Sequence, residues 1–203
     1  MIRRIQLLLK RALDVTVSFA ALTLLSPLMA LIALAIKLDD HGPVLFVQDR
    51  VGRGGDTFRC FKFRTMIQGA ESKGLGLPLV KGDPRITPVG DLLRHWTLDE
   101  IPQLFNVLKG DMSIVGPRPT VPSQVARYSL LQRRRLEVKP GMAGWAWIHG
   151  RNSIPWQKRI ELDIWYVDHW SLLLDFRILI KAFVMVFRRE GLYDADGMVR
   201  GLE

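Results

Sequence analysis

Two adjacent carboxylates are the residues of this chain best suited to chemistry. Asp99 and Glu100 stand in the segment 97–108, TLDEIPQLFNVL, whose apolar spacing predicts a helix over residues 98–108. Neighbouring carboxylates repel each other unless a cation or a charged reaction partner lies with them. The backbone dipole at a helix start favours an ionised Asp99, which is the form that acts as a nucleophile. A carboxylate pair also binds a hard cation such as Mg²⁺ together with substrate phosphates.

The same acidic pair has a purely structural interpretation. Thr97 and Glu100 have the spacing of a capping box, in which Glu100 reaches back to the amide at the helix start. Asp99 is likewise an ordinary acid for the first turn of a helix. From these residues alone, the capping and catalytic interpretations of Glu100 are about equally supported.

Several cationic side chains flank the acidic pair. Lys62 and Arg64 are two residues apart on a strand predicted over residues 57–63, so they should share one face, which suits a diphosphate. Arg94 comes shortly before the acidic pair. A solvated strand edge is the alternative explanation for Lys62 and Arg64.

A second basic element follows the predicted helix. Pro117 and Pro119 restrict the loop around Arg118, and a guanidinium on a stiff loop is a good phosphate fork. A simple surface turn is the alternative. The run 133–135, three consecutive arginines, predicts a solvated or lipid-headgroup face rather than a catalytic element.

An uncharged stretch of 22 residues, 15–36, predicts a membrane anchor. As a helix it is about 33 Å long, enough to cross a bilayer core of about 30 Å, and its apolar part is too long for a signal peptide. Basic residues precede it, which places the N-terminus in the cytoplasm. Pro27 predicts a kink, and the hydroxyls of Thr23 and Ser26 can bond the backbone that the proline leaves free. We also expect Arg11 to pair with Asp14 along the helix.

Two topologies stay open for this segment. A kinked helix that spans the bilayer has the better support from the sequence alone, because proline is common in such helices. A re-entrant hairpin gains weight if the following domain needs a cytoplasmic substrate.

The remaining chain predicts a helix-rich α+β domain after the membrane segment, with domains at residues 1–38 and 39–203. Residues 170–187 contain three charges and predict an amphipathic helix in the membrane interface rather than a span. The other expected elements are strands at 44–47 and 57–63 around a glycine-rich turn at 52–56, a loop-rich segment at 69–90, and helices at 91–95, 98–108 and 121–136.

Composition limits the partners of the chain. It has 203 residues, with 29 Lys and Arg against 20 Asp and Glu, and a net charge of +9. So basic a protein favours anionic partners, such as nucleic acid, acidic lipid or phosphorylated small molecules. The one cysteine, Cys60, excludes an intrachain disulfide.

The ordered set of motifs resembles the bacterial sugar transferases, the monotopic phosphoglycosyl transferases, from Lys10 almost to Tyr193. The chain is most similar to the minimal branch of that family. The matching pieces are Lys10-Arg11-x-x-Asp14, Ser26-Pro27, FKFRTM at 61–66, DPRIT at 83–87, LDE at 98–100 through Pro117-Arg118-Pro119, KPG at 139–141, Asp163-x-x-Tyr166 and Trp170-Ser171.

The resemblance implies a specific reaction. Asp99 would attack the β-phosphate of a UDP-sugar and release UMP, and undecaprenyl phosphate would then take the sugar phosphate. It implies Glu100 and Mg²⁺ as charge partners of the phosphates, with Asp99 and Glu100 as the metal ligands. Lys62, Arg64, Arg94 and Arg118 would be cationic clamps. It also implies a re-entrant helix broken at Ser26-Pro27, with the catalytic domain on the cytoplasmic face of the bacterial inner membrane.

Two other classes of function remain as alternatives. One is a membrane-tethered basic adaptor for nucleic acid or acidic lipid, although no nucleic-acid module is recognisable in the sequence. The other is a structural protein with a spanning helix and an exported domain. The sequence leaves open the sugar, the glycan pathway, the partner glycosyltransferases and the oligomeric state, a homodimer included. We expect sugar specificity in the segment 69–81 and after Lys139.

Overall fold

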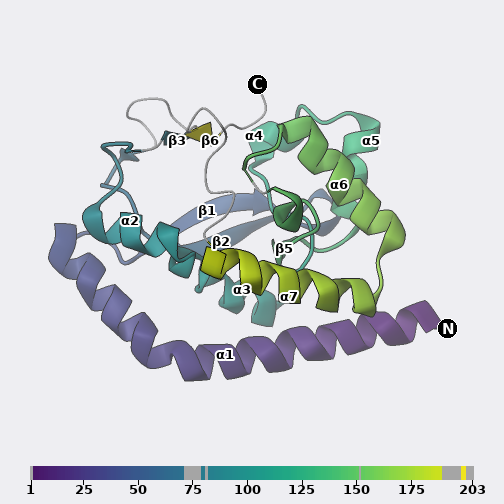
Figure 1. Cartoon of the computed structure of the whole chain (residues 1–203), viewed down its shortest axis with the longest axis horizontal. Coiled ribbons are helices and arrows are strands. Elements are labelled where there is room, and N and C mark those ends of the chain that lie inside the picture. The colour runs from purple at the N-terminus through teal and green to yellow at the C-terminus, as the bar shows by residue number, and fades with distance from the viewer. Residues whose placement is uncertain (1, 71–78, 81, 151, 189–197, 200–203) are drawn as a thin grey trace.

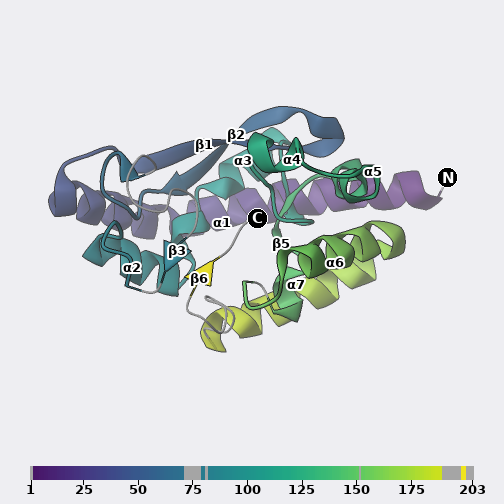
Figure 2. The ribbon, with the colours of Figure 1, turned by 90° about the horizontal axis from the view of Figure 1, so that it is seen from above.

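Helix α1 (Ile2–Asp40) runs along one side of the protein, and the other elements pack against it (Figure 1). The computed structural model describes residues 2–70, 79–80, 82–150, 152–188 and 198–199. Small sheets and several short helices follow α1, which confirms the helix-rich α+β class. Seen from above, the ribbon of β1 (Leu45–Val51) and β2 (Thr57–Phe63) and the pair of α6 (Trp156–His169) and α7 (Leu172–Arg188) lie on either side of α1 (Figure 2).

Pro27 lies inside α1, and the helix bends partway along its length (Figure 1). Proline cannot donate to the carbonyl of Thr23, and the hydroxyl of Ser26 bonds that oxygen instead, at 2.8 Å. The Thr23 hydroxyl in turn donates to Phe19 O at 3.0 Å. The predicted kink and its local compensation are therefore confirmed. By length and composition, α1 can cross a membrane; its path in a bilayer stays a prediction.

Lys10 links α1 to the C-terminal helices. Its ammonium donates to Asp175 at 2.5 Å and to the carbonyl of Val115 at 2.9 Å. Asp175 also accepts from the hydroxyl of Tyr166 at 2.7 Å and from the indole of Trp170 at 3.2 Å. These bonds join the first half of α1 to three segments that are distant in sequence.

Arg11 and Asp14 hold α1 to the middle of the chain. Arg11 donates to the carbonyls of Val107 and Leu108 at 2.6 and 2.7 Å, at the end of a helix where backbone acceptors are open. Asp14 is buried and accepts from the amide of Ile114 at 3.0 Å. The predicted Arg11–Asp14 pair is therefore wrong, because each side chain caps backbone groups of another element.

Strands β1 (Leu45–Val51) and β2 (Thr57–Phe63) form an antiparallel ribbon. The turn between them contains a short 3₁₀ segment, η1 (Arg53–Gly55), where Gly54 and Gly55 have φ of 75° and 100°. That left-handed backbone favours glycine, as the glycine-rich turn predicts. β2 matches its prediction, whereas β1 runs beyond residue 47 because its later polar residues pair with β2 across the whole ribbon.

The helix predicted over residues 98–108 is two pieces. A 3₁₀ turn, η3 (Leu98–Glu100), precedes α3 (Gln103–Lys109), and Pro102 lies at the break. Thr97 has a left-handed φ of 58° and its side chain makes no capping bond. The capping box is therefore wrong, since Thr97 does not have the extended backbone that a capping residue needs.

Other elements depart from the predictions in length. α2 (Pro88–His95) begins earlier than expected, capped by Thr87. The helix predicted over 121–136 is broken, since Ser129 starts a new helix with its own capping box. Its pieces are α4 (Pro122–Val125), α5 (Leu130–Arg133) and η4 (Arg134–Glu137).

The C-terminal half adds two longer helices. The predicted amphipathic helix is confirmed as α7 (Leu172–Arg188), whereas α6 (Trp156–His169) was not predicted. The small elements are η5 (Trp147–His149), the parallel pair β4 (Ser113–Val115) and β5 (Gly141–Ala143), and the antiparallel pair β3 (Leu79–Val80) and β6 (Met198–Val199). Residues 71–78 and 81, within the predicted loop, lie outside the described residues.

Two apolar clusters hold these elements together. One joins the second half of α1 to α2, α3 and Phe63, and the other joins α6 and α7 to β4 and η5. Between them, Gly116 and Gly141 let two backbones meet: a Cβ on Gly141 would lie 2.0 Å from the amide nitrogen of Gly116. This close approach places the loop after β4 beside β5.

Candidate active site

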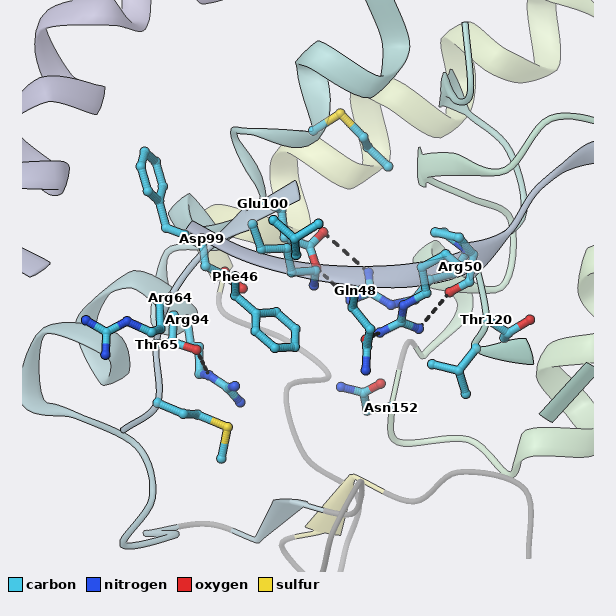
Figure 3. A pocket seen from close by; sticks show the side chains of 18 of the residues that line it. Phe46, Gln48, Arg50, Arg64, Thr65, Arg94, Asp99, Glu100, Thr120 and Asn152 are labelled. Carbon is cyan, nitrogen blue, oxygen red and sulfur yellow. Dashed lines mark hydrogen bonds and ion pairs between the residues drawn. The ribbon is translucent and has the colours of Figure 1, made fainter. Parts of the chain in front are cut away.

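A cavity of about 750 Å³ opens between the β1–β2 ribbon, η3 and the loop after β4 (Figure 3). It gathers most of the predicted phosphate-site residues, although they come from distant parts of the chain. Those that line it are Lys62, Arg64, Arg94, Asp99, Glu100, Arg118 and Pro119. Pro117 lies instead along a small hollow behind the loop.

Glu100 is held by two cations at the wall of this cavity. Its side chain is almost wholly buried, and Oε1 accepts from Lys62 at 2.8 Å and from Arg118 at 2.6 Å. The negative charge of Glu100 is the main reason that the pKa of Arg118 is raised. The partners of the Glu100 carboxylate are therefore fixed.

Asp99 differs from its neighbour. Its half-buried side chain faces the cavity, and no hydrogen bond or ion pair to its carboxylate is found in the described part of the chain. Burial raises the pKa of Asp99, Lys62 lowers it, and the charge of Glu100 raises it further. Asp99 lies in a single 3₁₀ turn rather than at the start of the long helix that was predicted, and desolvation is the largest influence on its pKa. The nearby cations are what favour the ionised form.

Arg94 is placed by direct packing of α2 on the segment after β2. A Cβ on Gly90 would lie 2.0 Å from the carbonyl oxygen of Thr65, so only glycine allows this approach. Arg94 donates from Nε to the hydroxyl of Thr65 at 2.8 Å (Figure 3). The rest of its guanidinium is directed along the cavity near Asp99.

Arg64 has a different environment from Lys62. β2 ends at Phe63, and the guanidinium of Arg64 binds both carboxylate oxygens of Asp40 and the carbonyl of Pro43. Arg64 therefore ties the end of α1 to the edge of the cavity, while Lys62 is directed at the acidic pair.

The three consecutive arginines do not share one environment. Arg133 is exposed, and Arg134 pairs with the exposed Asp168. Arg135 is buried and donates to Asp163 at 2.5 Å and to the carbonyl of Arg118 at 2.9 Å. The prediction of a solvated face is thus wrong for Arg135, because α6 covers it.

Asp163 is the buried partner in this contact. Burial raises its pKa to about 6, and Arg135 opposes that rise. The sequence offered one signal, the Asp163-x-x-Tyr166 motif, but nothing that assigned Arg135 as its partner.

Sequence reasoning also missed the polar end of the cavity. Gln48 and Arg50 of β1 lie there, opposite Asn152 (Figure 3). Arg50 donates to Gln48 Oε1 at 2.6 Å and to the carbonyl of Pro119 at 3.1 Å. The alternation of Phe46, Gln48 and Arg50 was the available signal, since side chains two apart on a strand share a face.

The donors for a metal ion are few. Within the described residues, no cluster of three or more His, Cys, Asp or Glu side chains is positioned to hold one. Asp99 and Glu100 offer hard oxygen atoms beside the cavity, and Mg²⁺ is commonly bound by one or two carboxylates plus substrate phosphates. The pair therefore fits an ion that shares its ligands with a phosphorylated substrate.

Comparison with known proteins gives a consistent result. A family model described as "Bacterial sugar transferase" matches residues 5–189. The chain is 45% identical over 190 residues to the "Uncharacterized sugar transferase EpsL" of Bacillus subtilis, covering 94% of this chain and 93% of that protein.

Two further relatives have more informative names. The "Undecaprenyl-phosphate galactose phosphotransferase" of Salmonella typhimurium is 42% identical over 199 residues, covering 91% of this chain and 42% of its own length. The "Undecaprenyl-phosphate glucose phosphotransferase" of Komagataeibacter xylinus is 43% identical over 192 residues, covering 89% of this chain and 35% of its own length. The chain thus spans less than half of these two proteins.

Proposed function

Because the chain belongs to the bacterial sugar transferase family, we propose that it transfers a sugar-1-phosphate from a UDP-sugar to undecaprenyl phosphate. The products are UMP and undecaprenyl diphosphate-sugar, the first membrane-bound intermediate of a glycan such as an exopolysaccharide, an O-antigen or a capsule. The names of two relatives, at 42% and 43% identity, support the transfer of a sugar phosphate to undecaprenyl phosphate.

One observation carries the mechanism: Asp99 faces a cavity whose walls hold Lys62, Arg94 and Arg118, and among the described residues its carboxylate has no hydrogen-bond or ion-pair partner. In the first step, a carboxylate oxygen of Asp99 attacks the β-phosphorus of the UDP-sugar. The bond to the bridging oxygen breaks, and that oxygen leaves with its electron pair as part of UMP. The sugar phosphate stays on Asp99 as an acyl phosphate.

The second step restores the enzyme. A phosphate oxygen of undecaprenyl phosphate attacks the same phosphorus, and the bond to Asp99 breaks, which regenerates the carboxylate. Lys62, Arg94 and Arg118 stabilise the charge on the phosphate oxygens in both steps. Glu100 holds Lys62 and Arg118 in place during both steps, and Pro117 and Pro119 stiffen the Arg118 loop.

Magnesium is proposed as the cofactor, with Asp99 and Glu100 as its protein ligands. Bound there with a diphosphate, it would neutralise phosphate charge. Because Glu100 already binds two cations, Asp99 and the substrate would supply most of the ligands.

The membrane segment gives this chemistry its location. One substrate is a soluble nucleotide sugar and the other is a lipid phosphate, so the site belongs at a membrane surface. We propose that α1 enters and leaves the bacterial inner membrane on the cytoplasmic side, bent at Ser26-Pro27. Its first half is fixed to the catalytic domain by Lys10, Arg11 and Asp14. The exposed apolar face of α7, with Phe176 and Phe183, would lie in the interface.

The proposal is tested by UMP release from a panel of UDP-sugars, with Mg²⁺ and undecaprenyl phosphate. We expect release that depends on one class of sugar and falls by about 10³-fold or more in Asp99→Asn. The matched control is Asp91→Asn, an exposed acid on α2, which should keep wild-type rates. Without the lipid, a donor labelled in its β-phosphate should leave base-labile label on the wild type and none on Asp99→Asn. Full activity in Asp99→Asn would remove Asp99 as the nucleophile.

A further inference from the structure

We infer that the polar end of the cavity, formed by Phe46, Gln48 and Arg50 of β1 together with Asn152, is the subsite that binds the sugar ring of the donor. The inference rests on the proposed function and deepens it. It assigns the choice of sugar to side chains of a strand and to Asn152, which lies in the region after Lys139 that the sequence suggested, rather than to the segment 69–81.

The ribbon connects this subsite directly to the reacting groups. Phe46 is paired with Lys62 in the strand register, so both project from the same face of the ribbon. Gln48 and Arg50 follow on that face and span about 13 Å from Phe46 to Arg50, which accommodates a hexose. Figure 3 shows Phe46 beside Asp99, with Gln48 and Arg50 extending away from it and Asn152 across the cavity.

The direction of attack decides which end takes the sugar. Phosphoryl transfer places the entering and leaving oxygens in line on opposite sides of phosphorus. UMP leaves opposite Asp99 in the first step, and the lipid phosphate must attack opposite Asp99 in the second. The nucleotide and the lipid phosphate therefore use the same side of phosphorus in turn, and that side must be open to the membrane.

The end of the cavity near Arg64 meets this requirement. Arg64 binds Asp40, the last residue of α1, and Pro43 and Leu45 line the cavity directly after that helix. The membrane segment thus ends beside this part of the cavity. The sugar is attached to a phosphate oxygen that does not react, so it projects to the side, toward Gln48 and Arg50.

The chemistry of the polar end suits a sugar. Amide and guanidinium groups bind hydroxyl groups, and the ring of Phe46 can cover the apolar face of a pyranose. These groups are also oriented in advance. Arg50 is fixed between Gln48 Oε1 and the carbonyl of Pro119. Arg159 donates to Asn152 Oδ1 at 3.4 Å and to the Asn152 carbonyl at 3.1 Å.

A fixed polar site can discriminate between hydroxyl patterns. When a UDP-sugar lacks a hydroxyl or carries it in the inverted position, a buried hydrogen-bonding group of the site loses its partner. This loss lowers the binding free energy more than the loss of an apolar contact does. The polar end should therefore determine which UDP-sugar is used, while the cations near Asp99 bind the diphosphate common to all donors.

The test compares Gln48→Ala and Asn152→Ala with Asp49→Asn, an exposed control on the opposite face of β1. For each protein we would measure kcat/KM for the preferred UDP-sugar and for its epimers, and the inhibition constant of UMP, which lacks the transferred sugar. Thermal melting in detergent would verify that each variant folds. We expect kcat/KM for the preferred donor to fall about tenfold in each alanine variant, and the preference over epimers to narrow. UMP inhibition and the Asp49→Asn variant should be unchanged.

Two results would overturn the inference while leaving the proposed function standing. One is unchanged discrimination between epimers in both alanine variants. The other is weaker UMP inhibition in parallel with the loss of kcat/KM, which would make this end the nucleotide subsite. A wild type that releases no UMP from any donor is a different result, because it would remove the proposed function and this inference with it.

Discussion

Arg135 and Asp163 form a buried ion pair of 2.5 Å, with side-chain exposures of 4% and 3%. The same guanidinium donates to the carbonyl of Arg118 at 2.9 Å, and Arg118 binds Glu100. A chain of contacts thus runs from α6 to the acidic pair. We therefore expect Arg135 and Asp163 to position the Arg118 loop.

Asp163→Asn should lower the rate of UMP release about tenfold at pH 7.5, since a neutral amide holds Arg135 less firmly than a carboxylate does. Asp163 has a pKa of about 6, so the wild type loses the same ionic contact as pH falls through that value. The ratio of wild-type to variant rate should therefore approach one below pH 6. Asp168→Asn is the matched control, because it breaks the exposed pair with the neighbouring Arg134 and should leave the rate unchanged. A rate ratio that is constant with pH would contradict a role for the ionised carboxylate.

The stability of the protein should fall as pH rises, whereas the rate of the wild type relative to Asp163→Asn should rise. The pKa of Asp163 rises from the model-compound value of 3.8 to about 6 on folding, so between these values the folded state binds more protons than the unfolded state. The contribution of Asp163 to the free energy of unfolding is therefore greatest at low pH, and it falls by about 2 kcal/mol as pH rises from 4 to 7. Melting curves of the wild type and of Asp163→Asn across this range measure the effect as a difference between the two proteins. If the wild type instead becomes more stable relative to Asp163→Asn as pH rises toward 7, the ionised pair stabilises the fold.

Glu100→Gln tests the acidic pair without changing its size. The neutral amide cannot balance the positive charges of Lys62 and Arg118, so we expect a loss of about 100-fold in the rate of UMP release. The charge of Glu100 also raises the pKa of Asp99, so the acid limb of the remaining activity should move to lower pH. Glu137→Gln, which changes an exposed acid, is the control. An acid limb that moves to higher pH would be inconsistent with this electrostatic coupling.

The sequence predicted features whose causes are local. The kink at Pro27 and the bond from Ser26 to Thr23 depend on residues within one turn, and the β2 strand follows from its own alternation. The acidic pair was found because neighbouring carboxylates are unusual in themselves. Most of the predicted phosphate-site residues do line one cavity, but their roles there remain proposals.

The sequence could not predict features that depend on distant packing. Arg134 and Arg135 are neighbours of the same type and both pair with an aspartate of α6, yet Arg134 is part-exposed and Arg135 is buried. The capping box failed for a similar reason: Glu100 is bound by Lys62 and Arg118 from other elements. Gln48 and Arg50 lie beyond the strand predicted over residues 44–47, and they reach the cavity because β1 continues to Val51 through its pairing with β2.

Asn106 should contribute strongly to stability. It is fully buried, and it bonds two backbone groups of β2 by accepting from the amide of Phe61 at 3.0 Å and donating to the carbonyl of Arg59 at 2.7 Å. Asn106→Ala leaves both backbone groups without this partner and should lower the free energy of unfolding by about 2 to 3 kcal/mol. Denaturant unfolding in detergent measures the loss, and Lys109→Ala, which changes an exposed residue of the same helix, should cost far less. A loss as small as that of Lys109→Ala would mean that α3 is held to β2 mainly by apolar contacts.

Pro27→Ala tests the path of α1 in the membrane. Alanine restores the amide that can donate to Thr23 O, so the Ser26 hydroxyl is no longer needed there and the helix should straighten. A straight α1 is long enough to span, which would place its two ends on opposite sides of the bilayer. Cysteines introduced at Arg4 and Asp39, both exposed, can be labelled from either side of sealed vesicles, while the native Cys60 is buried.

In the wild type, both introduced cysteines should be labelled from the cytoplasmic side, as a re-entrant helix requires. In Pro27→Ala, we expect a fraction of molecules with only one end accessible, and a matching loss of UMP release, because the catalytic domain would no longer meet its nucleotide substrate. Leu31→Ala changes an exposed apolar side chain in the same helix and should leave both accessibilities unchanged. If both ends of Pro27→Ala stay cytoplasmic, the bend is imposed by the contacts that the two halves of α1 make with the catalytic domain. Labelling of the two wild-type ends from opposite sides would instead establish a spanning helix.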